Sequence, residues 1–367
     1  MTTQQAPTPV SPEGLRPLLT IAIPTFNREH VLRRRMQELE RGVTPGVGVV
    51  VVDNASPDGT WALLGEAAAR HPWLRVARND RNLGCDANYL RVIEESDGEW
   101  CWLLGDDEPV SWSQLPALVE RLRSETAAVV HLVTGDVPWN ARNRTFFEDA
   151  ESFLGGFYDL FRFPHLSSNV VRTAVAKRHL SAAAPLRGLL HAYVPVVVKC
   201  LEAGGLRVHP SSILSGERPR RPRWRLVEGH LGAWETMHAS FPRRMARRID
   251  RLEAAGRARE VVQAAVEDLL GLGPSALTWA QVGRMLHLFP LRHYGLFLKL
   301  LGARAAWLWP DAFAALRIWL LRLGCREARL ADLAEALGTS PGPDLRPALA
   351  RAIRARARVR PGAAAGY

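Results

Sequence analysis

The stretch Val47-Gly-Val-Val-Val-Val-Asp-Asn-Ala-Ser-Pro-Asp-Gly-Thr60 joins an almost continuous apolar run to a cluster of turn-forming residues. β-branched residues without polar alternation are typical of a strand that is buried on both faces, as in a parallel sheet. Asp53 follows the run directly, and Asp58 is placed to cap a helix that carries Trp61 and Leu64. The stretch therefore predicts a strand–turn–helix unit whose polar residues gather where the strand ends.

The same succession recurs on both sides of this unit. Strands are predicted at residues 19–23, 47–52, 74–77 and 100–104, with a helical pattern after each of the first three. Further strands are predicted at residues 127–134, 167–171 and 206–213. Alternating strands and helices indicate an α/β fold with a mostly parallel sheet and helices on both of its faces.

Polar side chains follow three of these strands: Thr25-Phe-Asn-Arg28, Asp53-Asn54 and Asp106-Asp107-Glu108. In open α/β sheets ligands bind beyond the carboxyl ends of the strands, so we expect the functional edge there. Three adjacent acids repel one another unless something positive lies between them. They are explained either by a divalent cation that bridges substrate phosphates or by capping of a helix near Ser113.

Four motifs occur in the order and spacing of a known family: IPTFNR, VVDNASPDGT, NLGCDAN and WLLGDDE. This series resembles the family 2 glycosyltransferases, inverting enzymes of the GT-A fold that use nucleotide-diphosphate sugars. The GDDE motif resembles the branch that includes abequosyltransferases of lipopolysaccharide O-antigen assembly. The resemblance covers residues 18–110 well and weakens toward residue 215.

The resemblance implies roles for individual residues. Thr25 and Phe26 would line the nucleoside pocket, and Asp53 would accept a hydrogen bond from the base. Asp106 would contact the ribose, and Asp107 would ligate Mg²⁺ or Mn²⁺. Neutral or positive residues of the same loops would bind phosphate and sugar hydroxyls; these are Asn27, Arg28, Asn54, Asn82, Gly84 and Asn88. Local alternatives are a helix cap at Asn27 and turn chemistry at residues 82–84.

Two departures from the family pattern concern the chemistry. Gly105 stands where many relatives carry an additional Asp. The downstream Glu-Asp pair, whose Asp acts as general base in the family, is missing from GLLHAYVPVVVKCLEAGG. His191 lies near the expected place, and a neutral imidazole can accept a proton near pH 7. A buried structural role is the alternative for this histidine, and other candidate bases are Asp159, His165 and Glu151.

The 367-residue chain carries a net charge of +11 that is unevenly distributed. Residues 218–367 contain 26 Lys and Arg against 12 Asp and Glu, a net charge of +14, which leaves −3 for the rest. We predict a disordered Pro-rich segment at 1–17, a GT-A domain at 18–215 and a basic helical region at 216–367. Three interpretations of the basic region remain open: a solvated helical bundle, docking on an anionic membrane surface, and nucleic-acid binding. Because the region contains no recognisable nucleic-acid motif, no nucleic-acid partner is predicted.

The four cysteines are scattered without CxxC spacing, and no stretch has the length and composition of a signal peptide or a membrane span. A cytoplasmic location is therefore expected. The protein could in addition attach peripherally to the inner face of the cell membrane.

The predicted function is inverting transfer of a sugar from a nucleotide-diphosphate sugar to a glycan or lipid-linked acceptor, in polysaccharide, O-antigen or other glycoconjugate biosynthesis. One alternative is a non-catalytic nucleotide-sugar-binding scaffold or sensor. Another is a nucleotidyltransferase, although IPTFNR lacks the glycines of a phosphate loop.

Overall fold

The computed structural model describes residues 16–134, 144–157, 163–186, 188–214, 226–245 and 248–249. By its internal contacts the chain divides into two units, residues 1–219 with 232–249 and residues 220–231 with 250–367. Nearly all described residues belong to the first unit, whose fold follows. The predicted disordered segment 1–17 and basic region 216–367 lie mostly outside the described residues, so both, and their boundaries, stay predictions.

Within the described residues, eight strands form one mixed sheet in the order β3-β2-β1-β4-β7-β5-β8-β6. The strands are β1 (Leu19–Thr25), β2 (Val47–Asp53), β3 (Leu74–Arg78), β4 (Trp100–Leu103), β5 (Val129–Thr134), β6 (Phe146–Phe147), β7 (Asn169–Arg172) and β8 (Leu206–Leu214). The neighbours β3, β2, β1 and β4 run parallel, as do β5 and β8. Strands β7 and β6 pair antiparallel with their neighbours. The prediction of a mostly parallel sheet is confirmed.

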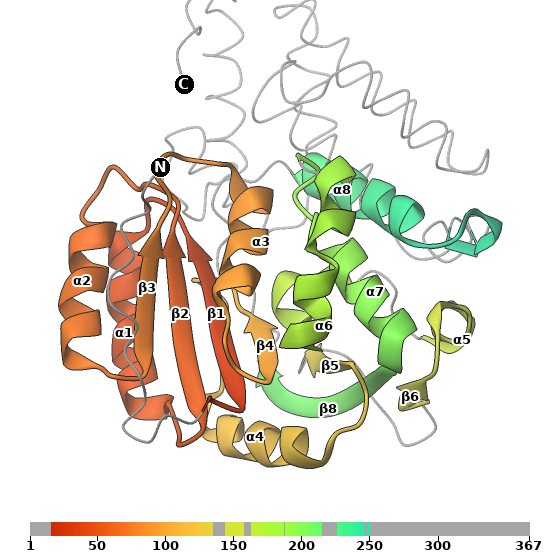
Figure 1. Cartoon of the computed structure of the whole chain (residues 1–367), viewed down its shortest axis with the longest axis horizontal. Helices are drawn as coiled ribbons and strands as arrows, with labels where there is room; N and C mark the ends of the chain where they lie inside the picture. Colours follow the sequence, from red (N-terminus) through yellow and green to blue (C-terminus); the bar gives the residue numbers. More distant parts are fainter. Residues whose placement is uncertain are drawn as a thin grey trace, which may run out of the picture. The chain divides into compact units, whose positions relative to one another are not determined.

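Helices cover both faces of the sheet, as predicted (Figure 1). The α-helices are α1 (Glu29–Gly42), α2 (Thr60–Arg70), α3 (Cys85–Glu95), α4 (Leu115–Ser124), α5 (Ala150–Gly156), α6 (Thr173–Arg178), α7 (Val194–Gly204) and α8 (Leu226–Ser240). Short 3₁₀ helices are η1 (Trp112–Gln114), η2 (Leu166–Ser168), η3 (Leu180–Leu186) and η4 (Arg243–Met245). Helices α1, α2 and α4 pack on one face, and α3, α6 and α7 lie on the other. No helix in the described part of the chain combines the length and the apolar character that a membrane span requires.

Each central strand contributes to two hydrophobic cores, one on each face of the sheet. In β4, Trp100 and Trp102 point into the core under α1, α2 and α4, whereas Cys101 and Leu103 point into the opposite core. All four side chains are buried. Burial of such a side chain contributes roughly 1.5–3 kcal/mol, and this two-sided burial explains why the strands appear as unbroken apolar runs.

The strand register brings polar residues to one edge of the sheet. Thr25 is the register partner of Asp53, and Asp53 is that of Arg78, so the three lie in one row across β1, β2 and β3. The strand order reverses between β1 and β4, since β2 and β3 lie on one side of β1 and β4 lies on the other. Open α/β sheets bind their ligands at such a switch point.

Candidate functional site

Asp53 is held by its own loop and by the neighbouring strand. Its side chain is fully buried, accepts hydrogen bonds from the backbone N–H and the hydroxyl of Ser56, and pairs with Arg78 Nε at 3.1 Å. Burial raises the pKa of Asp53, although the Ser56 hydrogen bonds and the Arg78 charge act in the opposite direction. The carboxylate is therefore fixed in orientation beside a cation, a geometry suited to accepting a directed hydrogen bond.

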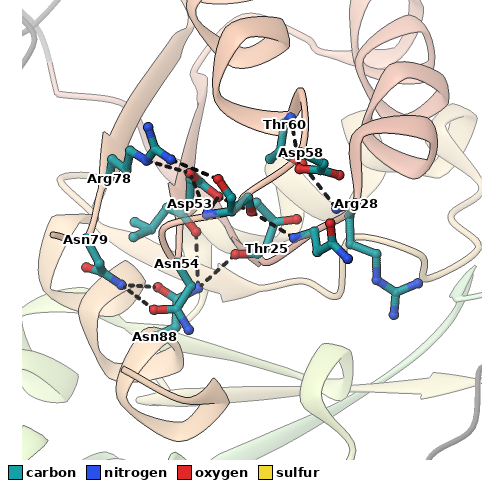
Figure 2. Close-up of polar contacts among 12 residues, drawn as sticks. Thr25, Arg28, Asp53, Asn54, Asp58, Thr60, Arg78, Asn79 and Asn88 are labelled. Atoms are coloured by element: carbon teal, nitrogen blue, oxygen red, sulfur yellow. Dashed lines mark hydrogen bonds and ion pairs between the residues drawn. The ribbon is translucent and has the colours of Figure 1, made fainter. Parts of the chain in front are cut away.

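The loop that follows β1 is bound to the loop that follows β2 by three consecutive backbone hydrogen bonds (Figure 2). The N–H groups of Asn27, Arg28 and Glu29 donate to Ser56 Oγ at 2.8 Å, Thr60 Oγ1 at 3.1 Å and Asp58 Oδ2 at 3.1 Å respectively. These contacts leave the Arg28 side chain pointing away from the two loops (Figure 2). The loops that follow β1 and β2 are separate in sequence, and these bonds hold them together as one surface.

Asp58 caps two helices at once. Its Oδ1 accepts from the backbone N–H of Thr60, the first residue of α2, at 3.1 Å. Its Oδ2 accepts from the backbone N–H of Glu29, the first residue of α1, at 3.1 Å. The predicted cap of α2 is thus confirmed. The alternative that Asn27 caps α1 is wrong, because no side chain of its own loop caps this helix and Asn27 has φ 56°.

A network of asparagine amides, most of them buried, shapes the loops after β2 and β3 (Figure 2). Asn79 Nδ2 donates to the side-chain oxygens of Asn54 and Asn88, each at 2.9 Å. Asn54 Nδ2 in turn donates to Asn82 Oδ1 at 2.8 Å and to the carbonyl of Gly84 at 3.3 Å. Each of these amides is engaged within the protein, as turn chemistry in this loop implies.

Asp106 and Thr25 meet at the switch point between β1 and β4. Thr25 Oγ1 donates to Asp106 Oδ2 at 2.8 Å, and both side chains are buried. Burial, and next the charge of Asp107, raises the pKa of Asp106 to about 6. Asp107 is more accessible, with 32% of its side chain exposed, and its Oδ2 lies 3.7 Å from Arg28 Nη2. The two adjacent acids therefore differ: one is buried and hydrogen-bonded, and the other faces solvent beside an arginine.

The turn that carries Asp106, Asp107 and Glu108, here called the acidic turn, is held in place by Arg35 of α1. Its Nε donates to the carbonyl of Asp106 at 3.2 Å, and its Nη2 donates to the carbonyl of Glu108. The nearest helix, α4, begins only at Leu115, and no side chain caps it or the preceding η1. The alternative that these acids cap a helix is wrong, since the turn is fixed through its carbonyls and the acid side chains stay at the rim.

Glu108 connects the acidic turn to the segment before β7. Its Oε2 lies 3.3 Å from His165 Nε2 and accepts from Ser167 Oγ at 3.4 Å. The other ring nitrogen of His165 is 3.1 Å from Ser168 Oγ. Strand β7 pairs with β4, which is why His165 reaches a turn that lies nearly 60 residues earlier in sequence. His165, one of the candidate bases, therefore lies next to the acids.

His191 lies in the segment between η3 and α7. Its Nδ1 is 3.1 Å from the carbonyl of Pro164, the residue before His165, so both histidines are tied to the same short segment. Tyr193 donates its hydroxyl to the same carbonyl. Another candidate base, Glu151, lies in α5 and pairs with Arg244 at 3.5 Å, with both side chains 72% exposed. The candidate base Asp159 lies outside the described residues.

The structure adds three charged residues that sequence reasoning missed: Arg35, Arg78 and Asp86. Arg35 is three residues from Leu32 and adjacent to Met36, so it shares the apolar face of α1, and a charge on such a face was the available signal. Asp86 is likewise buried in the first turn of α3. The sequence predicts a face of Ala87, Leu90 and Ile93 for this helix, and buried polar residues break that pattern.

A divalent cation fits this site only with help from a substrate. Among the residues that the structure describes, no three His, Cys, Asp or Glu side chains are grouped as a metal site would require. Mg²⁺ commonly binds through one or two carboxylates together with substrate phosphates. Asp107 is an accessible carboxylate of that kind, whereas one oxygen of Asp106 already accepts from Thr25. Asp107 would therefore hold the ion.

Comparison with known proteins identifies relatives of the described domain. Residues 20–179 match the family described as "Glycosyl transferase family 2". Abequosyltransferase RfbV of Salmonella typhimurium is 28% identical over 111 residues, which are 29% of this chain and 33% of that protein. Succinoglycan biosynthesis protein ExoO of Rhizobium meliloti is 30% identical over 137 residues, 37% of this chain and 38% of that protein. The chain thus spans about a third of the length of the curated relatives it matches.

Among solved structures, the mannosyltransferase PcManGT of Pyrobaculum calidifontis in complex with GDP-Man and Mn²⁺ is 19% identical. It aligns with a TM-score of 0.48 over 85% of this chain and 91% of its own.

The family match runs from β1 to the end of α6 and includes the parallel strands β1 to β4, the switch point and the acidic turn. The mixed sheet with helices on both faces is the GT-A type of fold that the resemblance implied. Over residues 20–179, this chain therefore matches the family 2 glycosyltransferases.

Proposed function

We propose that this chain transfers a sugar from a nucleotide-diphosphate sugar to an acceptor hydroxyl, with inversion at the anomeric carbon. The observation that carries the proposal is the pair of unlike acids at the switch point of a family 2 domain. Asp106 is buried against Thr25, and Asp107 faces solvent beside Arg28. The acceptor would be a glycan or a lipid-linked sugar in polysaccharide, O-antigen or other glycoconjugate biosynthesis.

The nucleoside would lie on the rim formed by β1 and β2. Phe26 is 40% exposed at the end of β1, so its ring is available to a base. Asp53 is the proposed acceptor of a base N–H, and its contacts with Ser56 and Arg78 fix its carboxylate where β2 ends. Asp106 would accept from a ribose hydroxyl.

The other predicted donor-binding residues divide into two groups. Arg28 carries the cation nearest to Asp107 and would contact the diphosphate. The remaining ones act mainly through the shape of the loops, since their amides or backbone groups are engaged internally. This group contains Asn27, Asn54, Asn82, Gly84 and Asn88.

Mg²⁺ or Mn²⁺ is the proposed cofactor, with Asp107 as its protein ligand. When bound, the ion would neutralise the charge that develops on the diphosphate as it leaves. Asp107 and Arg28 would keep the leaving group in place, and the buried Asp106 would orient the nucleotide.

His191 is the proposed general base. A carbonyl oxygen can only accept, so the contact of Nδ1 with Pro164 places the ring proton on Nδ1 and the lone pair of the neutral ring on Nε2. The acceptor oxygen would attack the anomeric carbon opposite the diphosphate, forming the new C–O bond as the bond to the diphosphate breaks. Nε2 would take the hydroxyl proton in this step.

His165 is the second candidate base because its ring faces Glu108 at 3.3 Å. Single variants separate the two: we expect His191→Ala to lower kcat at least 100-fold and His165→Gln to lower it less than tenfold. Steady-state kinetics at saturating donor measures both. A reversed order would assign the base to His165.

The central test is product formation with a panel of nucleotide sugars and acceptors, with and without Mn²⁺. We expect Asp107→Asn to abolish turnover and to remove the metal-dependent rise in Tm that the donor causes. Asp97→Asn is a matched control, since this carboxylate accepts from Thr20 Oγ1 at the opposite end of β1. Unchanged turnover in Asp107→Asn would contradict the metal role.

The scaffold or sensor function remains a second candidate because the Glu-Asp pair of the resembled family is missing and His191 only lies near the expected place. It predicts donor binding, seen as a rise in Tm, without any product from any acceptor. Docking of the basic C-terminal region on an anionic membrane, and the cytoplasmic location, stay predictions from the sequence.

A further inference from the structure

The carboxylate of Asp86 is enclosed by the backbone of a segment about 100 residues later. Its Oδ2 accepts from the N–H groups of Gly188 at 2.6 Å and Leu190 at 3.0 Å, and its Oδ1 accepts from Ala192 at 3.0 Å. The side chain is only 3% exposed. One buried carboxylate thus accepts from three backbone N–H groups. Without it these donors would lose their hydrogen-bond partner, which is costly for a buried group.

The conformation of the segment depends on this carboxylate. Gly188 and Leu190 have φ 98° and φ 66°, so two residues adopt the left-handed conformation and direct alternate N–H groups to the same side. A left-handed leucine costs about 1 kcal/mol or more, which an ordered contact must offset. Asp86 supplies that contact from the first turn of α3, where the helix dipole also favours an anion.

Helix α8 also contacts the segment. A Cβ placed on Gly232 of α8 would lie 2.1 Å from the carbonyl oxygen of Leu189, so the helix backbone packs directly against the segment. A second contact from α3 follows one turn later, where the rings of Tyr89 and Tyr193 meet edge to face at 5.9 Å. Both α3 and α8 therefore contact the segment.

We propose that Asp86 is a positioning residue for the transfer reaction. By fixing residues 188–192, it holds the His191 ring where Nδ1 meets the Pro164 carbonyl, and so sets the position of the proposed base. The inference rests on the proposed function, in which His191 is the general base. Misplacement of a base by about 1 Å can lower a rate about 100-fold.

The first test is Asp86→Asn, which keeps the size of the side chain but leaves a single acceptor oxygen. An NH₂ group then faces at least one of the three N–H groups. We expect kcat to fall 10- to 100-fold while the donor Kd changes less than threefold. Asp97→Asn, a carboxylate just beyond the other end of α3, is the matched control and should keep full turnover.

Two further measurements separate positioning from general damage. Slow exchange of the Gly188, Leu190 and Ala192 amides should be lost in Asp86→Asn but kept in Asp97→Asn. His-selective ¹⁵N spectra should show the Nδ1–H tautomer of His191 in the unaltered chain and a loss of this preference in the variant. Gly232→Ala, whose added methyl group presses on the Leu189 carbonyl and leaves Asp86 intact, should reproduce the fall in kcat.

The outcomes distinguish this inference from the proposed function. If the three amides and the tautomer are unchanged in Asp86→Asn, or if kcat stays within threefold, the positioning role is overturned while His191 can remain the base. If His191→Ala itself keeps full turnover, the base assignment fails, and the catalytic role of Asp86 fails with it. Loss of both kcat and amide protection supports the inference.

Discussion

The carboxylate of Asp58 accepts from the first backbone N–H of α1 and from the first backbone N–H of α2. Two helix N-termini thus share one negative charge, which satisfies donors that have no partner within the helices. Because the loss of one cap costs about 1 kcal/mol, we expect Asp58→Ala to lower the free energy of unfolding by about 1–2 kcal/mol at pH 7. Urea denaturation measures this difference.

The same cap gives a pH dependence whose sign follows from its pKa. Burial would raise the pKa of Asp58, but the hydrogen bonds from Thr60 and Glu29 outweigh it and lower the pKa below its usual value. The stabilisation is therefore complete above the unfolded-state pKa of about 4 and is lost as the pH falls through the lower folded-state value. The gap between the unaltered chain and Asp58→Ala should narrow as the pH falls from 5 to 2. A gap that stays constant would show that the charge is not involved.

Single residues also show how far the sequence could predict the site. Asp58 was recognisable as the cap of α2, because a local signal two residues before the helix is sufficient. Its contact with Glu29, and those of Asp86 with residues 188–192, join segments that are distant in sequence. No local sequence pattern encodes such pairs. The acids at the ends of the strands could therefore be predicted from the sequence, but the distant residues that contact them could not.

At the scale of elements, α1 supports the acidic turn through Arg35. The side chain is 3% exposed, contacts the carbonyls of Asp106 and Glu108, and lies 5.6 Å from the Trp112 ring centre. An unsatisfied buried acceptor costs roughly 1–3 kcal/mol. We therefore expect Arg35→Met to lower the free energy of unfolding by about 2–4 kcal/mol and to weaken donor binding about tenfold.

The matched control for this prediction is Arg34→Met on the same helix. Arg34 is 66% exposed and pairs with Glu38 at 3.6 Å, an arrangement that contributes less than about 1 kcal/mol. Arg35→Lys should recover only part of the loss, since an ammonium does not provide the two diverging donors of a guanidinium. Urea denaturation and donor titration check both values. Equal effects of the two methionine variants would argue that the turn does not depend on Arg35.

The order of the strands marks the limit of prediction at this scale. The first four strands follow from their apolar runs, and their parallel pairing follows from the intervening helices. Strand β7 was predicted near its observed place, but its antiparallel position between β4 and β5 depends on long-range pairing. That position brings His165 to Glu108. The contact between these two residues therefore could not be predicted from local sequence patterns.

For the molecule as a whole, the core of the first unit continues beyond the predicted end of the domain at residue 215. Among the residues described after that point, four apolar side chains are buried in it: Met237, Phe241, Met245 and Ile249. The Phe241 ring is stacked on Phe153 with centroids 6.1 Å apart, and it also contacts Phe163 at 6.3 Å. Removal of residues 216–249 would therefore uncover aromatic rings of the central core.

We expect a fragment of residues 16–249 to be markedly more stable than one of residues 16–215. Each buried large apolar side chain contributes roughly 1.5–3 kcal/mol, so the shorter fragment should lose several kcal/mol out of a total that is usually 5–15 kcal/mol. Thermal unfolding and limited proteolysis of the two fragments measure the difference. Phe241→Ala in the longer fragment tests the same contact alone and should cost about 3–5 kcal/mol. Equal Tm values for the two fragments would mean that the domain ends near residue 215, as the sequence predicts, and that α8 adds nothing to its core.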